Sequence, residues 1–202
     1  MIAVVDYGAG NIASVVKALE ALGAGVRVVS GPEQAAGARA LVVPGVGHFG
    51  STRALHARWQ RLTLQAIENG VPVLGICLGM QWMFEGSEED SEAAGLGIFP
   101  GRCVRLAGGV KVPHVGWNTL DTGGAASPLL AGLDAGASAY FTHSFAAPPA
   151  PGAIATTTHG GRFASAVARG RVFGVQFHPE KSGRTGLKLL TNFLDIVREA
   201  RP

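Results

Sequence analysis

The chain has 202 residues, of which 47% are hydrophobic and only 15% are charged. This length suits one domain with a substantial core, and the low charge fraction favours either a buried sheet or a large apolar interface with a partner. The net charge is +3, but the 17 basic residues are scattered and do not alternate with aromatic side chains, which argues against a nucleic-acid-binding protein.

The first half of the chain alternates short apolar runs with helical patterns. Apolar residues recur at helical spacing after the first run, and glycine follows each predicted helix. Buried strands that alternate with helices are typical of a mostly parallel sheet covered on both faces. The expected elements are strands at 2–5, 26–29, 40–43 and 71–76, and helices at 12–22 and 53–69.

The second half begins with an acidic loop at 85–92 and then changes character. Short strand-like runs follow one another without helices, which favours antiparallel strands and hairpins, and a helix at 187–198 closes the chain. We therefore expect one α/β domain over residues 1–202, with a mostly parallel central sheet flanked by helices and an added antiparallel region. The expected strands of this half are 103–106, 110–115, 139–145, 154–158, 163–167 and 172–177.

The segment Gly75-Ile76-Cys77-Leu78-Gly79 lies where a buried strand is expected to turn into a helix. It fits a nucleophile elbow with cysteine in place of serine. Such a turn strains the backbone of Cys77, and the flanking glycines allow close backbone approach. The helix N-terminus favours the thiolate, and the Leu78 N–H points to where an oxyanion would form. On this motif alone, a structural cysteine in a glycine-rich turn remains an equal alternative.

A base for this thiolate is predicted at His178, which follows the strand 172–177 and is followed by Pro179 and Glu180. Residues i and i+2 of an extended chain project to the same side, so Glu180 is placed to accept a hydrogen bond from one ring nitrogen of His178. The other nitrogen then faces the thiol, as in a catalytic triad. A loop histidine beside an acid is the alternative, and the presence of the elbow makes the triad the better interpretation.

The two cysteines, Cys77 and Cys103, imply no disulfide framework, which favours a reducing compartment. The chain starts directly in an apparent strand, without the pattern of a secretory leader. Its longest apolar stretch, 71–84, is interrupted by polar residues and glycines and is too short to span a membrane. We expect a cytoplasmic protein that neither enters a membrane nor binds nucleic acid.

The elbow, together with Gln81 and the run Phe177-His178-Pro179-Glu180, resembles the class I (triad) glutamine amidotransferases, which have a flavodoxin-like fold. Further segments narrow the resemblance to the glutaminase subunits of imidazole glycerol phosphate synthase, and it extends from about residue 2 to residue 198. It is weaker at Ala9 and Ser14, on the expected partner side. The segments that carry it are 6–11, 44–49, 113–118, 140–144 and 178–182.

The resemblance implies that glutamine is hydrolysed to glutamate and that the ammonia passes to a cyclase subunit, bound one to one, for histidine biosynthesis. Cys77 would attack the amide carbon, His178 would transfer the proton and Glu180 would orient His178. It implies no cofactor and no metal. The resemblance further assigns an oxyanion hole to Gly45, Val46 and Leu78. It assigns contacts with glutamine to Gln81, Glu89 and Ser144. It places the partner interface at Asn11, Trp117, Tyr140 and Lys181.

Three other functions are considered. A dinucleotide-binding module is suggested by Gly8-Ala9-Gly10 ahead of Ala13, but the expected acidic residue does not end the second strand, where Ser30 stands. Another class I amidotransferase would share the cysteine and the His-Glu pair but not the full set of segments. A non-catalytic relative would have lost the triad, whereas Cys77 is present.

Overall fold

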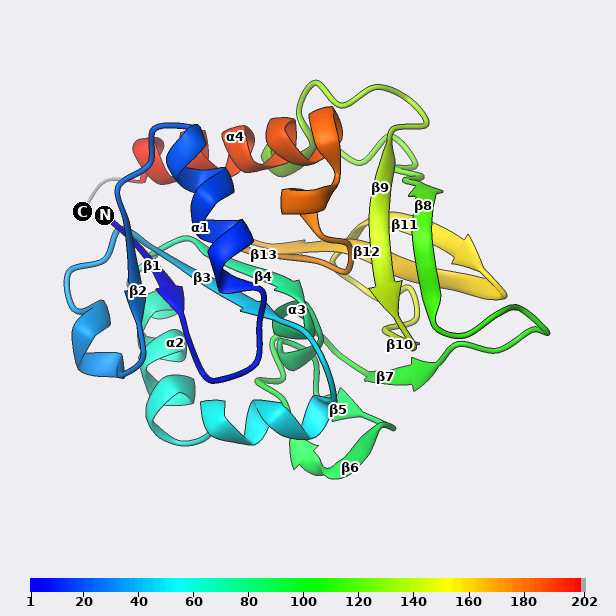
Figure 1. Ribbon diagram of the computed structural model, residues 1–202, viewed down its shortest axis with the longest axis horizontal. Coiled ribbons are helices and arrows are strands. Elements are labelled where there is room, and N and C mark those ends of the chain that lie inside the picture. The colour runs from blue at the N-terminus through cyan, green and yellow to red at the C-terminus, as the bar shows by residue number, and fades with distance from the viewer. Residues whose placement is uncertain (201–202) are drawn as a thin grey trace.

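The computed structural model describes residues 1–200, so the last two residues of the predicted domain lie outside the described part. Its largest sheet has seven strands in the order β11-β12-β13-β4-β3-β1-β2 (Figure 1). The five strands from β13 to β2 pair in parallel, and β12 and β11 extend the sheet as an antiparallel hairpin. Their bounds are β1 Ile2–Val5, β2 Val26–Val29, β3 Ala40–Gly45, β4 Val73–Cys77, β11 Ala153–His159, β12 Gly161–Arg169 and β13 Val172–Val175.

Alternating residues of the parallel strands divide the core into two layers. Val4 and Val42 belong to one hydrophobic cluster, whereas Val5 and Val43 belong to the other. This division follows from the two-residue period of a strand that is buried on both faces. Helices α1 (Ile12–Ala21) and α4 (Gly183–Glu199) cover the first face, and α2 (Arg58–Glu68) covers the second (Figure 1). The predicted α/β class is confirmed.

Two smaller sheets form the region that the second half of the chain adds. One has the order β10-β7-β5-β6, and the other is the antiparallel pair β8-β9, which lies at the end of the molecule away from both termini (Figure 1). The bounds are β5 Gly86–Ser87, β6 Asp90–Ala94, β7 Arg102–Arg105, β8 His114–Thr119, β9 Ser138–His143 and β10 Phe145–Ala146.

Several predicted elements need correction. The helix expected at 53–69 is divided into a 3-10 helix, η2 (Phe49–Leu55), and α2, because Ala57 adopts a positive φ of 55° that a continuous helix does not permit. The acidic segment 85–92 is not merely a loop, since it contains β5 and the start of β6. The strand expected at 110–115 begins only at His114, after Pro113, which has no N–H for a sheet ladder.

Other boundaries differ by a few residues. The strand expected at 40–43 continues through Pro44 to Gly45, and α4 begins at Gly183 rather than at residue 187. The last expected strand, 172–177, ends as β13 at Val175. It pairs antiparallel with β12 on one side and parallel with β4 on the other, so it joins the antiparallel hairpin to the parallel part of the sheet.

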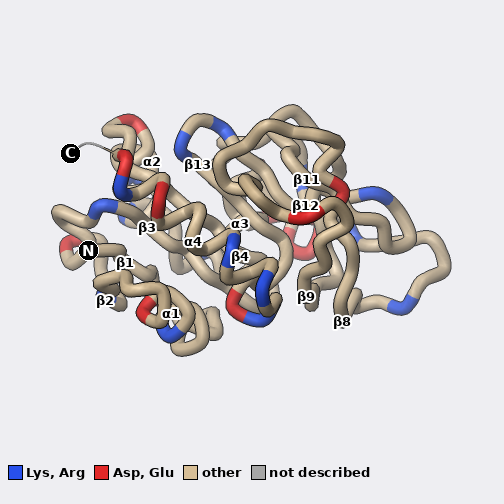
Figure 2. The backbone as a smooth tube through the Cα atoms, turned by 90° about the horizontal axis from the view of Figure 1, so that it is seen from above, with Lys and Arg blue, Asp and Glu red and all other residues tan. Residues whose placement is uncertain are grey.

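Charged residues are distributed over the described surface without a continuous basic stripe (Figure 2). In residues 1–200, none of the helices has both the length and the apolar character needed to cross a membrane.

We predict that Asn192 is a stability anchor. Its buried side chain donates hydrogen bonds of 2.9 and 2.8 Å to the carbonyls of Leu129 and Ala131, which ties the loop at η3 (Pro128–Leu130) to α4. Asn192→Leu leaves both carbonyls without this donor and should lower the free energy of unfolding by about 3 kcal/mol. Urea denaturation measures this change. The control is Thr191→Ala on the outer face of α4, and an equally small effect of both substitutions would contradict the prediction.

Candidate active site

Cys77 lies at the junction of β4 and the short helix α3 (Leu78–Trp82). Its backbone has φ 53° and ψ −108°, a conformation that is rare and costly for a residue with a side chain. The residue is 4% exposed and is a free cysteine. The strained, nearly buried cysteine at a strand-to-helix turn is the geometry that the elbow motif predicts.

Steric crowding explains the two glycines of the elbow. A Cβ at Gly75 would lie 2.6 Å from the carbonyl oxygen of Gly79, and a Cβ at Gly79 would overlap the carbonyl oxygen of Val43 on β3. Neither collision involves a flexible side chain that could move aside. The turn therefore holds Cys77 against the neighbouring strand only because these two positions have no side chain.

His178 follows β13, the neighbour of β4, and forms a buried pair with Glu180. The Nδ1 atom of His178 lies 2.9 Å from Oε1 of Glu180, while Nε2 is buried without a hydrogen-bond partner among the described residues. Burial lowers the pKa of His178, but the nearby Cys77 sulfur and the Glu180 carboxylate outweigh burial and raise the pKa to about 9. The imidazole is thus oriented by Glu180 and favours the protonated state.

Ser182 braces this histidine, although it is not among the functional residues predicted from the sequence. Its hydroxyl donates to the His178 carbonyl at 2.6 Å and accepts from the Tyr140 N–H at 2.9 Å. The His178 N–H in turn donates to the Tyr140 carbonyl at 2.9 Å. The backbone of β9 therefore fixes the turn that carries His178. A serine hydroxyl shared between distant backbone segments has no local sequence signature.

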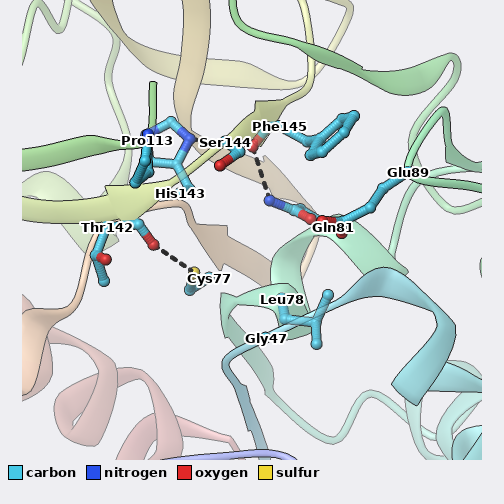
Figure 3. A pocket seen from close by; sticks show the side chains of 10 residues that line it. All are labelled: Gly47, Cys77, Leu78, Gln81, Glu89, Pro113, Thr142, His143, Ser144 and Phe145. Atoms are coloured by element: carbon cyan, nitrogen blue, oxygen red, sulfur yellow. Dashed lines mark hydrogen bonds between the residues drawn. The ribbon is translucent and has the colours of Figure 1, made fainter. Parts of the chain in front are cut away.

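A cavity of about 290 Å³ opens at Cys77 (Figure 3). The residues predicted to contact glutamine, Gln81, Glu89 and Ser144, all line it. Glu89 also accepts a hydrogen bond of 2.7 Å from the Phe49 N–H, which ties it to the segment after β3. The volume suits a small molecule. The remaining lining residues are Gly47, Leu78, Pro113, Thr142, His143 and Phe145.

The predicted oxyanion residues lie beside Cys77. Gly45, at the end of β3, is in register with Cys77, and Leu78 is the first residue of α3. A Cβ at Gly45 would overlap the Tyr7 hydroxyl and lie 2.8 Å from Cβ of Leu78, so only glycine fits there. Gly47 has a positive φ of 99° and is exposed, which leaves the turn at Val46 with a glycine on each side.

The predicted interface residues lie close to the same end of the sheet. Trp117 on β8 is 59% exposed and pairs in register with Tyr140 on β9, with ring centroids 6.2 Å apart. Lys181 is exposed directly after the His178–Glu180 turn. Asn11 precedes α1 and faces a narrow space that Val46 and His178 also line.

Two further histidines lie near the cavity but differ from His178. His143 and His114 are both buried, and Nε2 of His143 lies 3.1 Å from Nδ1 of His114. Nδ1 of His143 lies 3.0 Å from the Phe145 carbonyl oxygen. Burial lowers the pKa of His143 to about 3 and that of His114 to about 4, with neighbouring histidines adding to the effect. They are neutral structural groups at ordinary pH, and no group of three or more His, Cys, Asp or Glu in residues 1–200 is arranged to hold a metal ion.

Gln176 is a second residue that reasoning from the sequence missed. Its buried amide nitrogen lies 3.5 Å from the Cys77 sulfur, while the sulfur itself lies 3.9 Å from the Thr142 carbonyl. The one available signal was the position of Gln176 two residues before His178.

Residues 3–197 match the family model "Glutamine amidotransferase class-I". The chain is 47% identical to "Imidazole glycerol phosphate synthase subunit HisH" of Halobacterium salinarum, covering 98% of this chain and 94% of the relative. It is 44% identical to the protein of the same name from Moorella thermoacetica, covering 98% and 96%. Among solved structures, "Structure of PurLQS from Thermotoga maritima" is similar in fold, with a TM-score of 0.77, 20% identity and coverage of 96% and 97%.

We predict that stability depends on pH through His178. Because its folded-state pKa of about 9 lies above the ordinary value of 6.5, protonation stabilises the folded protein fully below pH 6.5, and this contribution is lost as pH rises through 9. Glu180→Gln should remove part of it. Urea unfolding of wild type and variant between pH 6 and 10 should show a stability difference that shrinks with rising pH. Parallel curves would mean that Glu180 does not raise this pKa.

Proposed function

The chain belongs to the class-I glutamine amidotransferases, and on this premise we propose that it is the glutaminase subunit of an imidazole glycerol phosphate synthase. Near-complete coverage of relatives named HisH at 44–47% identity supports this choice over other members of the family. The observation that carries the chemistry is the strained Cys77 beside the buried pair of His178 and Glu180, which follows the adjacent strand β13.

In the proposed reaction the Cys77 thiolate attacks the side-chain amide carbon of glutamine and forms a C–S bond. The tetrahedral intermediate then breaks its C–N bond, and His178 gives a proton to the departing nitrogen, which leaves as ammonia. Water attacks the resulting thioester, His178 takes up a proton, and glutamate leaves as the thiolate is restored. A pKa of about 9 supplies the protonated imidazole that the first step needs at neutral pH.

The oxyanion of both intermediates is proposed to bind the N–H groups of Leu78 and Val46. Leu78 begins α3, whose first N–H groups have no partner within the helix. Gly45 and Gly47 give the turn at Val46 the freedom to point either an N–H or a C=O at the cavity. One oxyanion donor is typically worth roughly 3 kcal/mol, so the orientation of this peptide could switch the rate by a hundredfold or more.

Substrate binding is assigned to the residues that share the cavity with Cys77. Gln81 projects from α3, and Glu89 and Ser144 reach the cavity from the smaller sheet region. We propose that these three side chains contact the amino-acid part of glutamine. Hydrolysis at this site uses no cofactor or metal.

The partner is proposed to be the cyclase subunit, bound one to one through the surface of Asn11, Trp117, Tyr140 and Lys181. The carboxyl ends of the parallel strands meet there, so ammonia released at Cys77 would leave directly toward the partner. A large exposed aromatic side chain is a typical anchor of an interface. We place the complex in the cytoplasm, which two free cysteines favour.

Replacing Cys77 with alanine should abolish synthesis that depends on glutamine and spare synthesis from added ammonia, because the cyclase site is untouched. The measurement is imidazole glycerol phosphate formation by the assembled enzyme with each nitrogen source. Cys103→Ser is the control, since Cys103 is buried in β7, where burial raises the pKa of its thiol. Glutamine use by Cys77→Ala at close to the wild-type rate would refute the assigned nucleophile.

Trp117→Ala should weaken association with the cyclase subunit by at least about tenfold, because it removes an aromatic anchor. Lys181→Ala should do so to a smaller degree. Titration calorimetry of the two subunits measures both changes. Leu64→Ala is matched as an exposed apolar residue on α2, outside the proposed surface. Unchanged affinity in both test variants would show that the partner binds elsewhere.

A further inference from the structure

A chain of hydrogen bonds runs from a backbone carbonyl to the sulfur of Cys77. The Nε2 group of Gln81 donates to the Phe145 carbonyl at 2.9 Å, shown in Figure 3, and to Oε1 of Gln176 at 3.1 Å. The Nε2 group of Gln176 then lies 3.5 Å from the sulfur. Gln81 is 4% exposed and Gln176 is 0% exposed, so water does not compete for these bonds.

The Phe145 carbonyl sets the direction of the whole chain, because a carbonyl oxygen only accepts. The nitrogen of Gln81 must face it, and the same nitrogen gives its second hydrogen to Gln176. Gln81 therefore has only its Oε1 atom left for a ligand in the cavity. Because Gln81 donates to Gln176, the oxygen of the Gln176 amide must face Gln81, and its N–H groups then face Cys77.

The backbone places Gln176 for this role. Val175 is in register with Ile76, so the next residues of the two chains, Gln176 and Cys77, are level with each other. The Gln176 N–H is anchored to the Ser165 carbonyl on β12 at 2.9 Å. Gln176 and His178 are separated by one residue, Phe177, in the segment that directly follows β13, and both approach Cys77 from the β13 side.

We propose that Gln176 is a positioning residue that serves two parts of this site at once. Its oxygen holds the amide of Gln81 with the acceptor Oε1 available to a donor group of the substrate, such as the ammonium of an amino acid. Its nitrogen donates to the Cys77 sulfur and favours the thiolate. An amide carries its acceptor and its donor on two separate atoms, so one side chain can bind both partners at once. The proposal rests on the glutaminase function proposed above.

The test compares Gln176→Met with wild type in the assembled enzyme. Methionine fills a similar volume without a strong donor or acceptor. The KM for glutamine should rise about tenfold, because the Gln81 amide is no longer fixed, and kcat should fall several-fold with the lost donor to sulfur. Ser165→Ala is the matched control, because its buried hydroxyl has no hydrogen-bond partner among the described residues and lies outside the chain of amides. It should leave both constants within twofold.

Labelling of Cys77 separates the two effects. Iodoacetamide reports the reactivity of the sulfur alone, whereas a glutamine-like chloroketone also needs recognition of the amino-acid part. Both rates should fall in Gln176→Met, and the chloroketone rate should fall about tenfold more. Equal rates to wild type for both reagents in a folded variant, checked by thermal unfolding, would overturn the proposal.

A second variant and the wild type complete the design. Gln176→Asn keeps an amide but is one methylene too short to span both partners, so it should show the same losses and provides the test should Gln176→Met not fold. Wild-type or near wild-type constants in Gln176→Asn would overturn the proposal. If wild-type protein reacts with iodoacetamide but gains nothing from the chloroketone, the proposed glutaminase function fails, independently of Gln176.

Discussion

The close approach of α3 to β3 is the constraint on which the site depends. It brings Gly79 so near the Val43 carbonyl that no side chain fits between them, and it leaves Cys77 at a positive φ on top of the sheet. Such strain persists only where the surroundings determine it completely. Here they do, since β4 lies between β3 and β13 and is covered on both faces by the two core layers.

The order of the strands assembles the chemistry around this point. β13 on one side of β4 delivers His178 and Gln176, and β3 on the other side delivers Gly45 and the turn at Val46. In parallel strands the carboxyl ends meet at one edge, so three segments that are far apart in the sequence converge without long loops. The position of His178, the proposed base, is further fixed by Ser182, which couples it to β9.

The sequence was informative where chemistry follows from local pattern. The elbow around Cys77 and the spacing of His178 and Glu180 each occupy a few consecutive residues, so the strained turn and the contact between His178 and Glu180 could be predicted. That contact forms through a 3-10 turn at Pro179–Lys181 and not through the extended chain expected from the sequence. Long-range contacts had no such signal. The bonds of Gln176 to Gln81 and Cys77, and of Ser182 to Tyr140, join residues more than 40 positions apart. The break at Ala57 depends on a backbone conformation that is rare for alanine. The glycine pattern at Gly8-Ala9-Gly10 shows that a local pattern can also mislead, because the same residues fit the phosphate-binding turn of a dinucleotide-binding protein.

The arrangement also connects the outer surface to His178, the proposed base. Trp117 is exposed on β8 and packs on Tyr140, and both the N–H and the carbonyl of Tyr140 take part in holding the His178 turn. A partner that contacts this aromatic pair would therefore act one hydrogen bond away from the His178 backbone. The glycine-flanked turn at Val46 lies on the other side of Cys77 and, within residues 1–200, lacks the combination of hydroxyl and backbone hydrogen bonds that holds His178. If His178 is the base and Val46 supplies the oxyanion donor, as proposed, the turn is the element that a bound partner could shift at least cost, because moving His178 would break several buried hydrogen bonds at once.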